Sequence, residues 1–415
     1  MLKRSTELEG ADVGRRDVST SACLRRRDLL LGVTALVGCG ETPKARSTPS
    51  PRLAPSRESA STSAPREMTL PEVESTPLES RALPTVPWGK ALLSARWPEL
   101  EALPWRNVLE EPTPLLPLVA DELGFAGLWL KQDAKSAQGY GGSKPRKLEP
   151  LFGKALAEGI EEVCTFGAQG SNHVAATAVH AKRLGLGCRA YLLPAPLDDH
   201  GRRNLELCKA AGATLVKAGS QREAEVKARR WLGKRSDAAL FPWGGSSPVG
   251  DLGCVAAALE LQAQFEVAGL APPDYVFVAG GTLGTAVGLE LGLRAAELPT
   301  ELVVMRASNR APYTQAHFEA ELQATLQQLT ALAPALESSL VGRAPRIDDS
   351  QLGSGYALPT RAGRAASAWM EARAGFSLDL TYTGKAFAGV LAQAPRLAGK
   401  RVVFWQTLDP NPQGT

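Results

Sequence analysis

Lys144 lies in a glycine-rich loop that could present its amine to a ligand. The loop spans residues 141–149, has no apolar periodicity and runs into a helical pattern. Glycine lacks a Cβ and lets the backbone approach a ligand closely, so we interpret Gly141 and Gly142 in this way. Pro145 suits the first position of a helix and fixes the turn before it. An amine in such a turn can form a Schiff base, and a solvated lysine at a helix start is the alternative.

Ser171, Asn172 and His173 form a polar turn between an apolar run and a helical pattern. Residues 163–166 have the composition of a buried strand, and residues 174–179 continue as a helix. The first amides of a helix and the positive end of its dipole favour an anion, so this turn is a candidate site for a carboxylate. Serine and asparagine are also the usual capping residues of helices, and a simple cap is the alternative.

A second loop of glycines and hydroxyls follows the apolar run at residues 276–279. It reads Gly-Gly-Thr-Leu-Gly-Thr over residues 280–285 and precedes a helical pattern. Backbone amides and threonine hydroxyls in such a loop bind phosphate. The loop lacks the Gly-Lys-Ser/Thr ending of a nucleotide-binding loop, and its glycine spacing does not fit dinucleotides. The expected ligand is a phosphate that needs neither a metal ion nor adenine.

Two tyrosines lie in glycine-containing segments of the last quarter of the chain. Tyr382 lies in the Thr-Tyr-Thr-Gly-Lys segment at 381–385, and Tyr356 lies in the Gly-Ser-Gly-Tyr segment at 353–356. Each one singly is expected to be a half-buried packing residue. Together with the lysine loop, they supply the rings and hydroxyls that a site for a planar cofactor would use.

In this order, the four segments resemble the pyridoxal-phosphate enzymes of the 1-aminocyclopropane-1-carboxylate (ACC) deaminase and D-cysteine desulfhydrase family. The resemblance extends over about residues 103–407. It implies a tryptophan-synthase-β-like fold, called fold type II, and pyridoxal 5′-phosphate held covalently by the protein. It also implies a small amino acid as the substrate and, because relatives are commonly dimers, a homodimer.

The resemblance assigns a role to residues in all four segments. Lys144 would hold the cofactor, and Lys147 would lie near its phosphate. Ser171 and Asn172 would face the substrate carboxylate and the ring oxygen of the cofactor, with His173 beside them. The other expected contacts are Gly280, Gly281, Thr282, Gly284 and Thr285 for the phosphate, Tyr356 and Tyr382 for the ring and substrate, and Thr407 near the pyridine nitrogen.

Two positions favour one reaction of this family over another. Its ring-opening deaminases have a glutamate after the tyrosine and a leucine at the later strand end, where this chain has Thr383 and Thr407. A threonine hydroxyl stays neutral and is a weaker partner for the pyridine nitrogen than a glutamate, but it suffices for β-elimination. The resemblance therefore implies a lyase that converts D-cysteine or a similar amino acid to pyruvate, ammonia and sulfide. The expected catalytic residues are Lys144, Ser171, Tyr356 and Tyr382.

The chain departs from the family pattern at two places. Ser143 stands where the family usually has asparagine, and Leu408, Asp409 and Pro410 replace a pair of glycines. Two alternative functions therefore stay open. One is ring-opening deamination of ACC. The other is an exported protein that binds the cofactor or an amino acid without turnover.

Residues 1–39 resemble an export signal. Three arginines at 25–27 precede an apolar stretch at 29–37 that is much shorter than the ~20 residues of a membrane-spanning helix. The arginines resemble a twin-arginine signal, and Leu-Val-Gly-Cys at 36–39 resembles a lipobox. Cys39 is therefore expected to carry a lipid that anchors the exported enzyme to a membrane, facing the periplasm or cell exterior. A basic tail before a buried helix is the alternative.

Residues 40–90 are expected to be a disordered linker. They are rich in Ser, Pro, Thr and Glu and poor in aromatic residues, so they cannot bury enough apolar surface to fold alone. Residues 91–415 then form the catalytic region. Its smaller lobe is expected at about 148–255, and the flanking segments form the larger lobe.

Strand-like apolar segments alternate with helical ones through the catalytic region. They include residues 128–130, 189–193, 213–216 and 301–305. This alternation predicts a mainly parallel, three-layer α/β/α architecture with ligands at the carboxyl ends of the strands. The chain has 415 residues, of which 44% are hydrophobic, which is enough for two lobes. Residues 313–340 are expected to be a packing helix.

Composition argues against several other functions. The net charge of +4 is too small to indicate a nucleic-acid partner. No pair of cysteines or histidines has the spacing of metal ligands, so no metal is expected, and His180 is expected to be structural. The six cysteines do not suggest a disulfide framework, because two lie in the leader and the other four are expected to be buried, namely Cys164, Cys188, Cys208 and Cys254.

Overall fold

The computed structural model describes residues 86–309, 314–334 and 344–408. The expected export signal with Cys39, and the expected linker up to residue 85, lie outside these residues. Asp409 and Pro410, which were expected to depart from the family pattern, also lie outside them.

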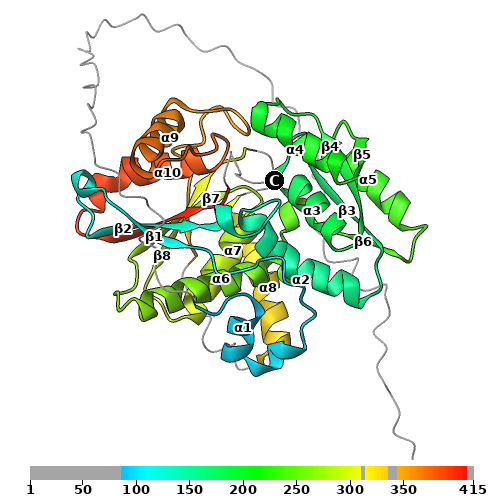
Figure 1. Ribbon diagram of the computed structural model, residues 1–415, viewed down its shortest axis with the longest axis horizontal. Helices are drawn as coiled ribbons and strands as arrows, with labels where there is room; N and C mark the ends of the chain where they lie inside the picture. The colour runs from blue at the N-terminus through cyan, green and yellow to red at the C-terminus, as the bar shows by residue number, and fades with distance from the viewer. Residues whose placement is uncertain (1–85, 310–313, 335–343, 409–415) are drawn as a thin grey trace, which may run out of the picture. The chain divides into compact units, whose positions relative to one another are not determined.

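The larger sheet has six strands in the order β1-β2-β10-β7-β8-β9 (Figure 1). β1 pairs antiparallel with β2, and the other neighbouring strands of this sheet pair in parallel. Pro117 lies in β1 at the edge of the sheet, as expected for a residue that cannot donate a backbone hydrogen bond. The strands are β1 (Leu115–Leu118), β2 (Gly127–Gln132), β7 (Tyr275–Gly280), β8 (Glu301–Arg306), β9 (Arg346–Asp348) and β10 (Arg401–Gln406).

Helices cover both faces of the larger sheet, because alternate residues of each strand point to opposite faces. Val276, Val278 and Trp405 belong to a core that includes α1, α6, α7 and α8. Phe277 and Phe404 belong to the opposite core, with α9 and α10 (Figure 1). These helices are α1 (Lys90–Arg96), α6 (Pro248–Val267), α7 (Gly284–Ala295), α8 (Gln315–Leu332), α9 (Arg361–Ala374) and α10 (Thr383–Gln393).

The smaller sheet has four parallel strands in the order β5-β4-β3-β6. Helices α2, α3 and α4 share a core with one face of this sheet, and α5 packs on the other. Its strands all lie within residues 162–240, and the chain thus has the expected two-lobed, three-layer α/β architecture. The elements are α2 (Ser143–Ala157), β3 (Glu162–Ala168), α3 (Asn172–Arg183), β4 (Gly187–Leu193), α4 (Asp199–Ala210), β5 (Thr214–Lys217), α5 (Gln221–Leu232) and β6 (Ala238–Leu240).

A packing helix, four buried cysteines and a structural histidine lie where the sequence predicts them. α8 lies inside the predicted helix at 313–340, and its Phe318, Leu322 and Leu329 are buried. The four cysteines expected to be buried are buried and unpaired. His180 is buried and contacts the carbonyl oxygen of Tyr140 through Nε2 at 2.9 Å, which is a structural role.

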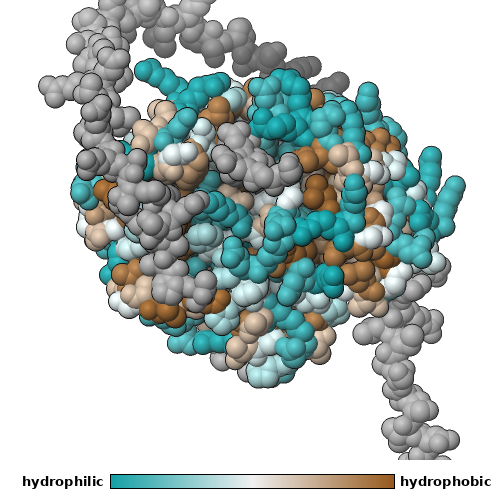
Figure 2. Space-filling model, in the orientation of Figure 1, coloured by the Kyte–Doolittle hydropathy of each residue, from teal (hydrophilic) through white to brown (hydrophobic). Residues whose placement is uncertain are grey.

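The surface visible in Figure 2 mixes polar and apolar residues over the whole face. Large hydrophobic residues that are exposed come from separate elements, for example Val119 after β1, Val226 in α5 and Val267 at the end of α6. Among the helices of the described segments, none is long and apolar enough to cross a membrane.

Candidate active site

One cavity lies where strands of both sheets end. It is bounded by Ala168 at the end of β3, by Ala279 near the end of β7 and by Thr407 just after β10. Ten of the expected site residues line it, namely Lys144, Ser171, Asn172, His173, Gly281, Thr282, Thr285, Tyr356, Tyr382 and Thr407. Lys147, Gly280 and Gly284 were also expected at the site but do not line the cavity. Parallel α/β proteins bind ligands at this edge of their sheets.

Lys144 lies in the first turn of α2 and lines the cavity. Loss of hydration lowers the pKa of its amine to about 7, and the nearby charge of Lys147 acts in the same direction. When ionised, the carboxyl group of Asp251 acts in the opposite direction but is weaker. A substantial share of the amine is therefore neutral at physiological pH, as a nucleophile or a base must be.

The backbone before Lys144 is fixed by hydrogen bonds to two other segments. Gly142 N donates to the carbonyl oxygen of Asp133 at 2.8 Å, and Ser143 N donates to that of Thr407 at 2.9 Å. Gly142 has φ +104°, and a Cβ on it would lie 2.6 Å from Thr407 O. A Cβ on Gly141 would overlap with the carbonyl oxygen of Ala134. The loop therefore needs both glycines for contacts within the protein.

Two sequence interpretations of this loop were wrong. Gly141 and Gly142 were expected to approach a ligand, but neither lines the cavity. Pro145 was expected at the first helical position, whereas α2 begins at Ser143 and Pro145 is its third residue. The proline still lies in the first turn, where backbone N–H groups have no partner within the helix.

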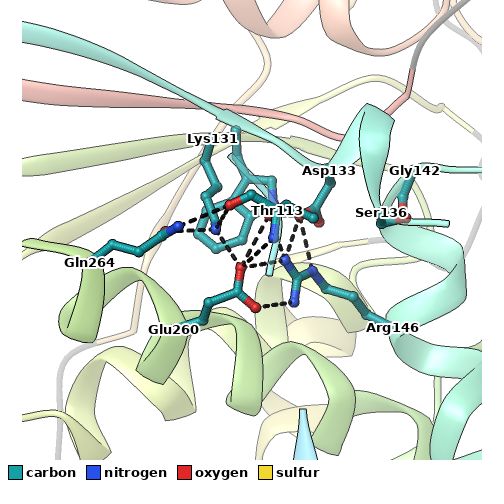
Figure 3. A network of polar contacts seen from close by, with 9 residues as sticks. Thr113, Lys131, Asp133, Ser136, Gly142, Arg146, Glu260 and Gln264 are labelled. Atoms are coloured by element: carbon teal, nitrogen blue, oxygen red, sulfur yellow. Dashed lines mark hydrogen bonds and ion pairs between the residues drawn. The ribbon is translucent and has the colours of Figure 1, made fainter. Parts of the chain in front are cut away.

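A buried polar network lies around Arg146, two residues after Lys144 (Figure 3). The Arg146 guanidinium donates to Asp133 Oδ1 through Nε at 2.9 Å and through Nη2 at 2.8 Å. It also donates to both oxygens of Glu260, at 3.0 Å each. Lys131 Nζ donates to Glu260 Oε1 at 2.5 Å and to Gln264 Oε1 at 2.7 Å. The network thus joins α2 to β2 and α6.

The same network reaches β10, the strand that precedes Thr407. Trp405 Nε1 donates to Asp133 Oδ2 at 2.8 Å, while the backbone oxygen of Asp133 holds Gly142. Burial would raise the pKa of Glu260, but Arg146 and Lys131 outweigh it and lower this pKa to about 2. Burial lowers the pKa of Lys131 to about 8, so both groups are charged at neutral pH. Removing one partner of such a network leaves an uncompensated buried charge.

The polar turn after β3 is the N-terminus of α3. Ser171 is the N-cap, and its Oγ accepts from Val174 N at 3.4 Å. The amide oxygen of Asn172 accepts from Tyr140 Oη at 3.1 Å and from Asn204 Nδ2 at 2.8 Å. Because its oxygen is engaged, the Nδ2 group of Asn172 is the part of the amide that can donate to a ligand.

His173 lines the cavity but is held by the protein. Its Nε2 lies 2.9 Å from Thr165 Oγ1, and its ring is buried. Burial first, and then the charges of Lys144 and Lys147, lower the pKa of His173 well below its usual range. The imidazole is therefore neutral in the physiological range. His173 can therefore serve to pack the cavity wall or to contact the substrate.

The loop between β7 and α7 has the form of an anion cradle, with Thr282 and Thr285 in the cavity wall. Lys147 lies behind this loop, where its Nζ donates to Ser246 Oγ at 3.0 Å. Ser246 Oγ also lies 2.7 Å from Thr282 Oγ1 and accepts from Gly284 N at 3.2 Å. Lys147 therefore acts on the cradle through Ser246.

The glycines of this loop differ in what they do. Only Gly281 lines the cavity. A Cβ on Gly280 would lie 2.7 Å from Val304 Cγ1, so this glycine allows close strand packing. A Cβ on Gly284 would overlap with Ser246 Oγ, so this one brings the helix start against Ser246.

Two tyrosines form one wall of the cavity. Tyr382 precedes α10, and a Cβ on Gly281 would lie 3.0 Å from Tyr382 Cε1, so the ring is close to the anion cradle. Tyr356 contacts Tyr382 edge to face, with ring centroids 6.0 Å apart. Thr383 follows Tyr382, but it is buried, and its hydroxyl donates to the carboxylate of Asp379. Thr383 therefore supplies no charge to the cavity.

Part of the cavity wall was not predicted from the sequence. Phe166 and Trp243 line it and stack on each other, with centroids 4.9 Å apart and planes 17° apart. Ser308 lines it also, and Ser246 supports the cradle. A signal for this region was present, because residues 242–247 read Pro-Trp-Gly-Gly-Ser-Ser after a short strand. That segment repeats the strand, glycine and hydroxyl pattern of the anion loop.

The residues around the cavity fit pyridoxal 5′-phosphate. Lys144 supplies an amine with a lowered pKa for covalent attachment, and the α7 N-terminus with Thr282 supplies a phosphate cradle. Tyr382 offers an aromatic wall, and Asn172 offers a donor for the ring oxygen. Groups of three or more side chains able to hold a metal ion do not occur among the residues that the structure describes.

Known proteins share both the sequence and the fold. The family model of pyridoxal-phosphate dependent enzymes matches residues 107–407. D-cysteine desulfhydrases from Klebsiella pneumoniae and Salmonella paratyphi B are each 34% identical to this chain, over 71% of this chain and 88% of theirs. A solved ACC deaminase homologue is 27% identical, with a TM-score of 0.65, over 75% of this chain and 93% of that one.

A solved T.th. threonine deaminase has the same fold, with 20% identity and a TM-score of 0.53 over 79% of this chain and 99% of that one. The expected fold type and cofactor are thus confirmed, while the roles of single site residues remain predictions. This chain belongs to the family of pyridoxal-phosphate-dependent enzymes.

Proposed function

We propose that this chain is a β-elimination lyase that releases sulfide from D-cysteine or a similar small amino acid. The class, a pyridoxal-phosphate-dependent lyase, follows from its relatives. The identity of the substrate is what we propose. This proposal is carried by the 34% identity to D-cysteine desulfhydrases over 88% of their length. The family model, which matches residues 107–407, spans nearly all of the residues that line the cavity.

The cofactor, when bound, supplies an electron-withdrawing ring that stabilises negative charge at the α-carbon of the substrate. Lys144 would hold the cofactor between turnovers and, once released, take the α-proton on its Nζ. Its pKa of about 7 suits this role, since a base works best when its pKa lies near the operating pH. Loss of the α-proton and of the thiolate on Cβ leads, after hydrolysis, to pyruvate, ammonia and sulfide.

The N-terminus of α3 would orient the substrate. The first amides of a helix lack partners within the helix, and its dipole favours a carboxylate there. Ser171 caps this helix and lines the cavity, and Asn172 follows it. On the opposite wall, Tyr382 would contact the ring. The stacked pair of Phe166 and Trp243 would exclude water from that side of the site.

Ring-opening deamination of ACC is the second candidate, because a solved structural relative is an ACC deaminase homologue. The described site gives it less support. The position after Tyr382 is a neutral threonine whose hydroxyl is bound to Asp379, and the later strand end has Thr407. Neither position supplies a carboxylate that could favour a protonated cofactor ring.

An assay of the purified full chain tests the substrate. With D-cysteine, we expect sulfide and pyruvate, and with ACC, no 2-oxobutyrate. The variant Lys144→Ala should lose both the release of sulfide and the absorbance of the covalently bound cofactor. Production of 2-oxobutyrate from ACC without sulfide from D-cysteine would replace this proposal by the second candidate. Cofactor absorbance without any turnover would favour the binding protein.

We also propose that the enzyme is exported and anchored through a lipid on Cys39. This proposal is supported by the sequence of residues 1–39 alone. Export by the twin-arginine route suits a protein that must acquire its cofactor in the cytoplasm, because that route carries folded proteins.

A further inference from the structure

Two buried carboxyl groups lie behind the anion cradle and take no part in the chemistry proposed above. Asp251 lies in the first turn of α6 and is fully buried, and Glu321 lies on α8 with a side chain 13% exposed. The two carboxyl groups are hydrogen-bonded to each other. A carboxylate can only accept a hydrogen bond, so such a contact requires a proton on one partner. The pair therefore shares a proton.

One oxygen of Asp251 points to the start of α7. A Cβ on Gly284 would overlap with both Asp251 Oδ1 and Ser246 Oγ, so these two atoms flank the same point of the backbone. Asp251 Oδ1 has no hydrogen-bond partner among the described residues, while Oδ2 accepts from Thr325 Oγ1 at 3.3 Å. A buried oxygen without a partner thus faces the helix terminus that forms the cradle.

The charges around the pair come from three helices. Lys147 of α2 acts on both carboxyl groups, and His317 of α8 lies 3.8 Å from Glu321. When ionised, Asp251 also raises the pKa of Cys254 in α6 and of Lys144 in α2. Burial raises the pKa of Asp251 well above its usual range, Glu321 raises it further, and Lys147 opposes both. Burial also raises the pKa of Glu321.

We propose that Asp251, with Glu321 as its proton partner, is a further member of the phosphate site and makes retention of the cofactor depend on a proton. A phosphate in the cradle and an ionised Asp251 would be two anions at one helix terminus, sharing Lys147. Like charges at close range disfavour ionisation, so the bound phosphate holds the proton on the pair. The inference uses the cofactor that family membership establishes and is independent of the substrate.

The sign of the pH effect follows from reciprocal linkage. If the bound phosphate raises the pKa of the pair, protonation of the pair must strengthen the binding of the phosphate by the same factor. Retention is then strongest at low pH and weakens as pH rises through the pKa of the pair. A shift of about one pKa unit corresponds to about tenfold in affinity.

Release of the cofactor from the full-length holoenzyme tests this inference. Release into an excess of a scavenging amine would be followed by absorbance at pH 6.5 and pH 8.5, for the wild type, Asp251→Asn, Glu321→Gln and Glu290→Gln. Glu290 is a matched control, because it lies two turns along α7 and pairs with Arg294 at 2.6 Å. Only the difference between proteins is interpreted, since Lys144 also titrates in this range.

The two variants of the pair should differ in direction. Asp251→Asn removes the charge, so the cofactor should be retained at both pH values. The increase in release rate from pH 6.5 to pH 8.5 should be at least about fivefold smaller than in the wild type. Glu321→Gln keeps Asp251 and its burial but removes the carboxyl group that raises its pKa further, so release should be faster than in the wild type at pH 8.5. Glu290→Gln should behave as the wild type. A purely structural role would accelerate release in both variants alike.

Infrared spectra of the same holoenzymes give a readout that does not depend on release. The wild type at pH 7 should show a protonated carboxyl band that is weaker in Asp251→Asn and unchanged in Glu290→Gln, because buried Glu149, whose pKa is raised to about 7, contributes to the band in every protein. An unchanged band in Asp251→Asn, or an unchanged pH dependence of release in that variant, would overturn the inference.

Discussion

Lys144 owes its chemistry to its surroundings more than to its residue type. An ordinary lysine of pKa about 10.5 has roughly one neutral amine in 3,000 at pH 7. With its pKa lowered to about 7 by burial and by Lys147, about half of the Lys144 amines are neutral at that pH. The glycine loop and the proline, which drew attention to this lysine in the sequence, do not by themselves cause this change.

The lowered pKa gives a pH dependence for capture of the cofactor by the apoenzyme. Only the neutral amine attacks the aldehyde, so the rate of reconstitution should rise with pH and level off at about pH 8. Stopped-flow absorbance between pH 5.5 and 10.5 would measure it. A rate that keeps rising tenfold per pH unit up to pH 10 would show that the amine is fully hydrated in the free enzyme.

At the next scale, the loop before α2 depends on a contact with the end of β10. Gly142→Ala would place a Cβ 2.6 Å from Thr407 O and disturb the hydrogen bond from Ser143 N. We expect kcat/KM to fall at least about tenfold, a barrier change of about 1.4 kcal/mol, because Lys144 moves with the loop.

Gly159→Ala is the matched control for that variant. Gly159 also has a positive φ, +69°, but nothing lies within 4 Å of its added Cβ. It should lose about 1 kcal/mol of stability from backbone strain and keep the wild-type kcat/KM. If both variants lose activity equally, the contact with Thr407 is not what matters.

The network around Arg146 belongs to the scale of packed elements, because it joins α2, α6, β2 and β10. Glu260→Gln should destabilise the protein by about 3–5 kcal/mol, since Lys131 would keep a buried charge without its carboxylate and Arg146 would keep Asp133 alone. Chemical denaturation would measure this change. Glu206→Gln removes an exposed partner of Lys209 and should change stability by less than about 0.5 kcal/mol. Equal effects of the two variants would contradict a role for burial.

The elements near the site could be predicted because the sequence patterns that indicate them lie within short stretches of the chain. The segments around Lys144, Ser171 and Thr282 each show a strand or loop, a glycine and a helix start within about ten residues, and in a parallel α/β fold such ends meet at one edge. The network could not be predicted in this way. Arg146 and Glu260 are 114 residues apart, and a charged residue in a helical pattern is normally expected at the surface.

Other misses have similar causes. Asp251 carries no local pattern that distinguishes it from a capping acid in the first turn of α6, and its partner lies on α8. Trp243 was passed over because the strand that precedes it, β6, has only three residues. β1 was passed over because Pro117 argues against a strand unless the strand is at an edge.

At the scale of the whole molecule, both sheets contribute to one cavity. The loop before Lys144 leads into α2 of the smaller lobe, and the loop at residues 280–285 connects β7 to α7 of the larger lobe. The proposed export adds a prediction outside the folded enzyme. In a bacterial host fed with labelled palmitate, the full chain should be labelled and sediment with membranes. Cys39→Ala should lose the label, whereas Cys23→Ala, in the same leader, should keep it. Equal labelling of both variants would place the lipid elsewhere or refute the anchor.

The identity of the lysine that holds the cofactor can be measured directly. The holoenzyme would be reduced with borohydride, which makes the bond between amine and cofactor permanent, then digested and analysed by mass spectrometry. We expect the mass of the reduced cofactor on the peptide that contains Lys144. Its appearance on Lys147, on Lys385 or on no lysine would contradict the site described here.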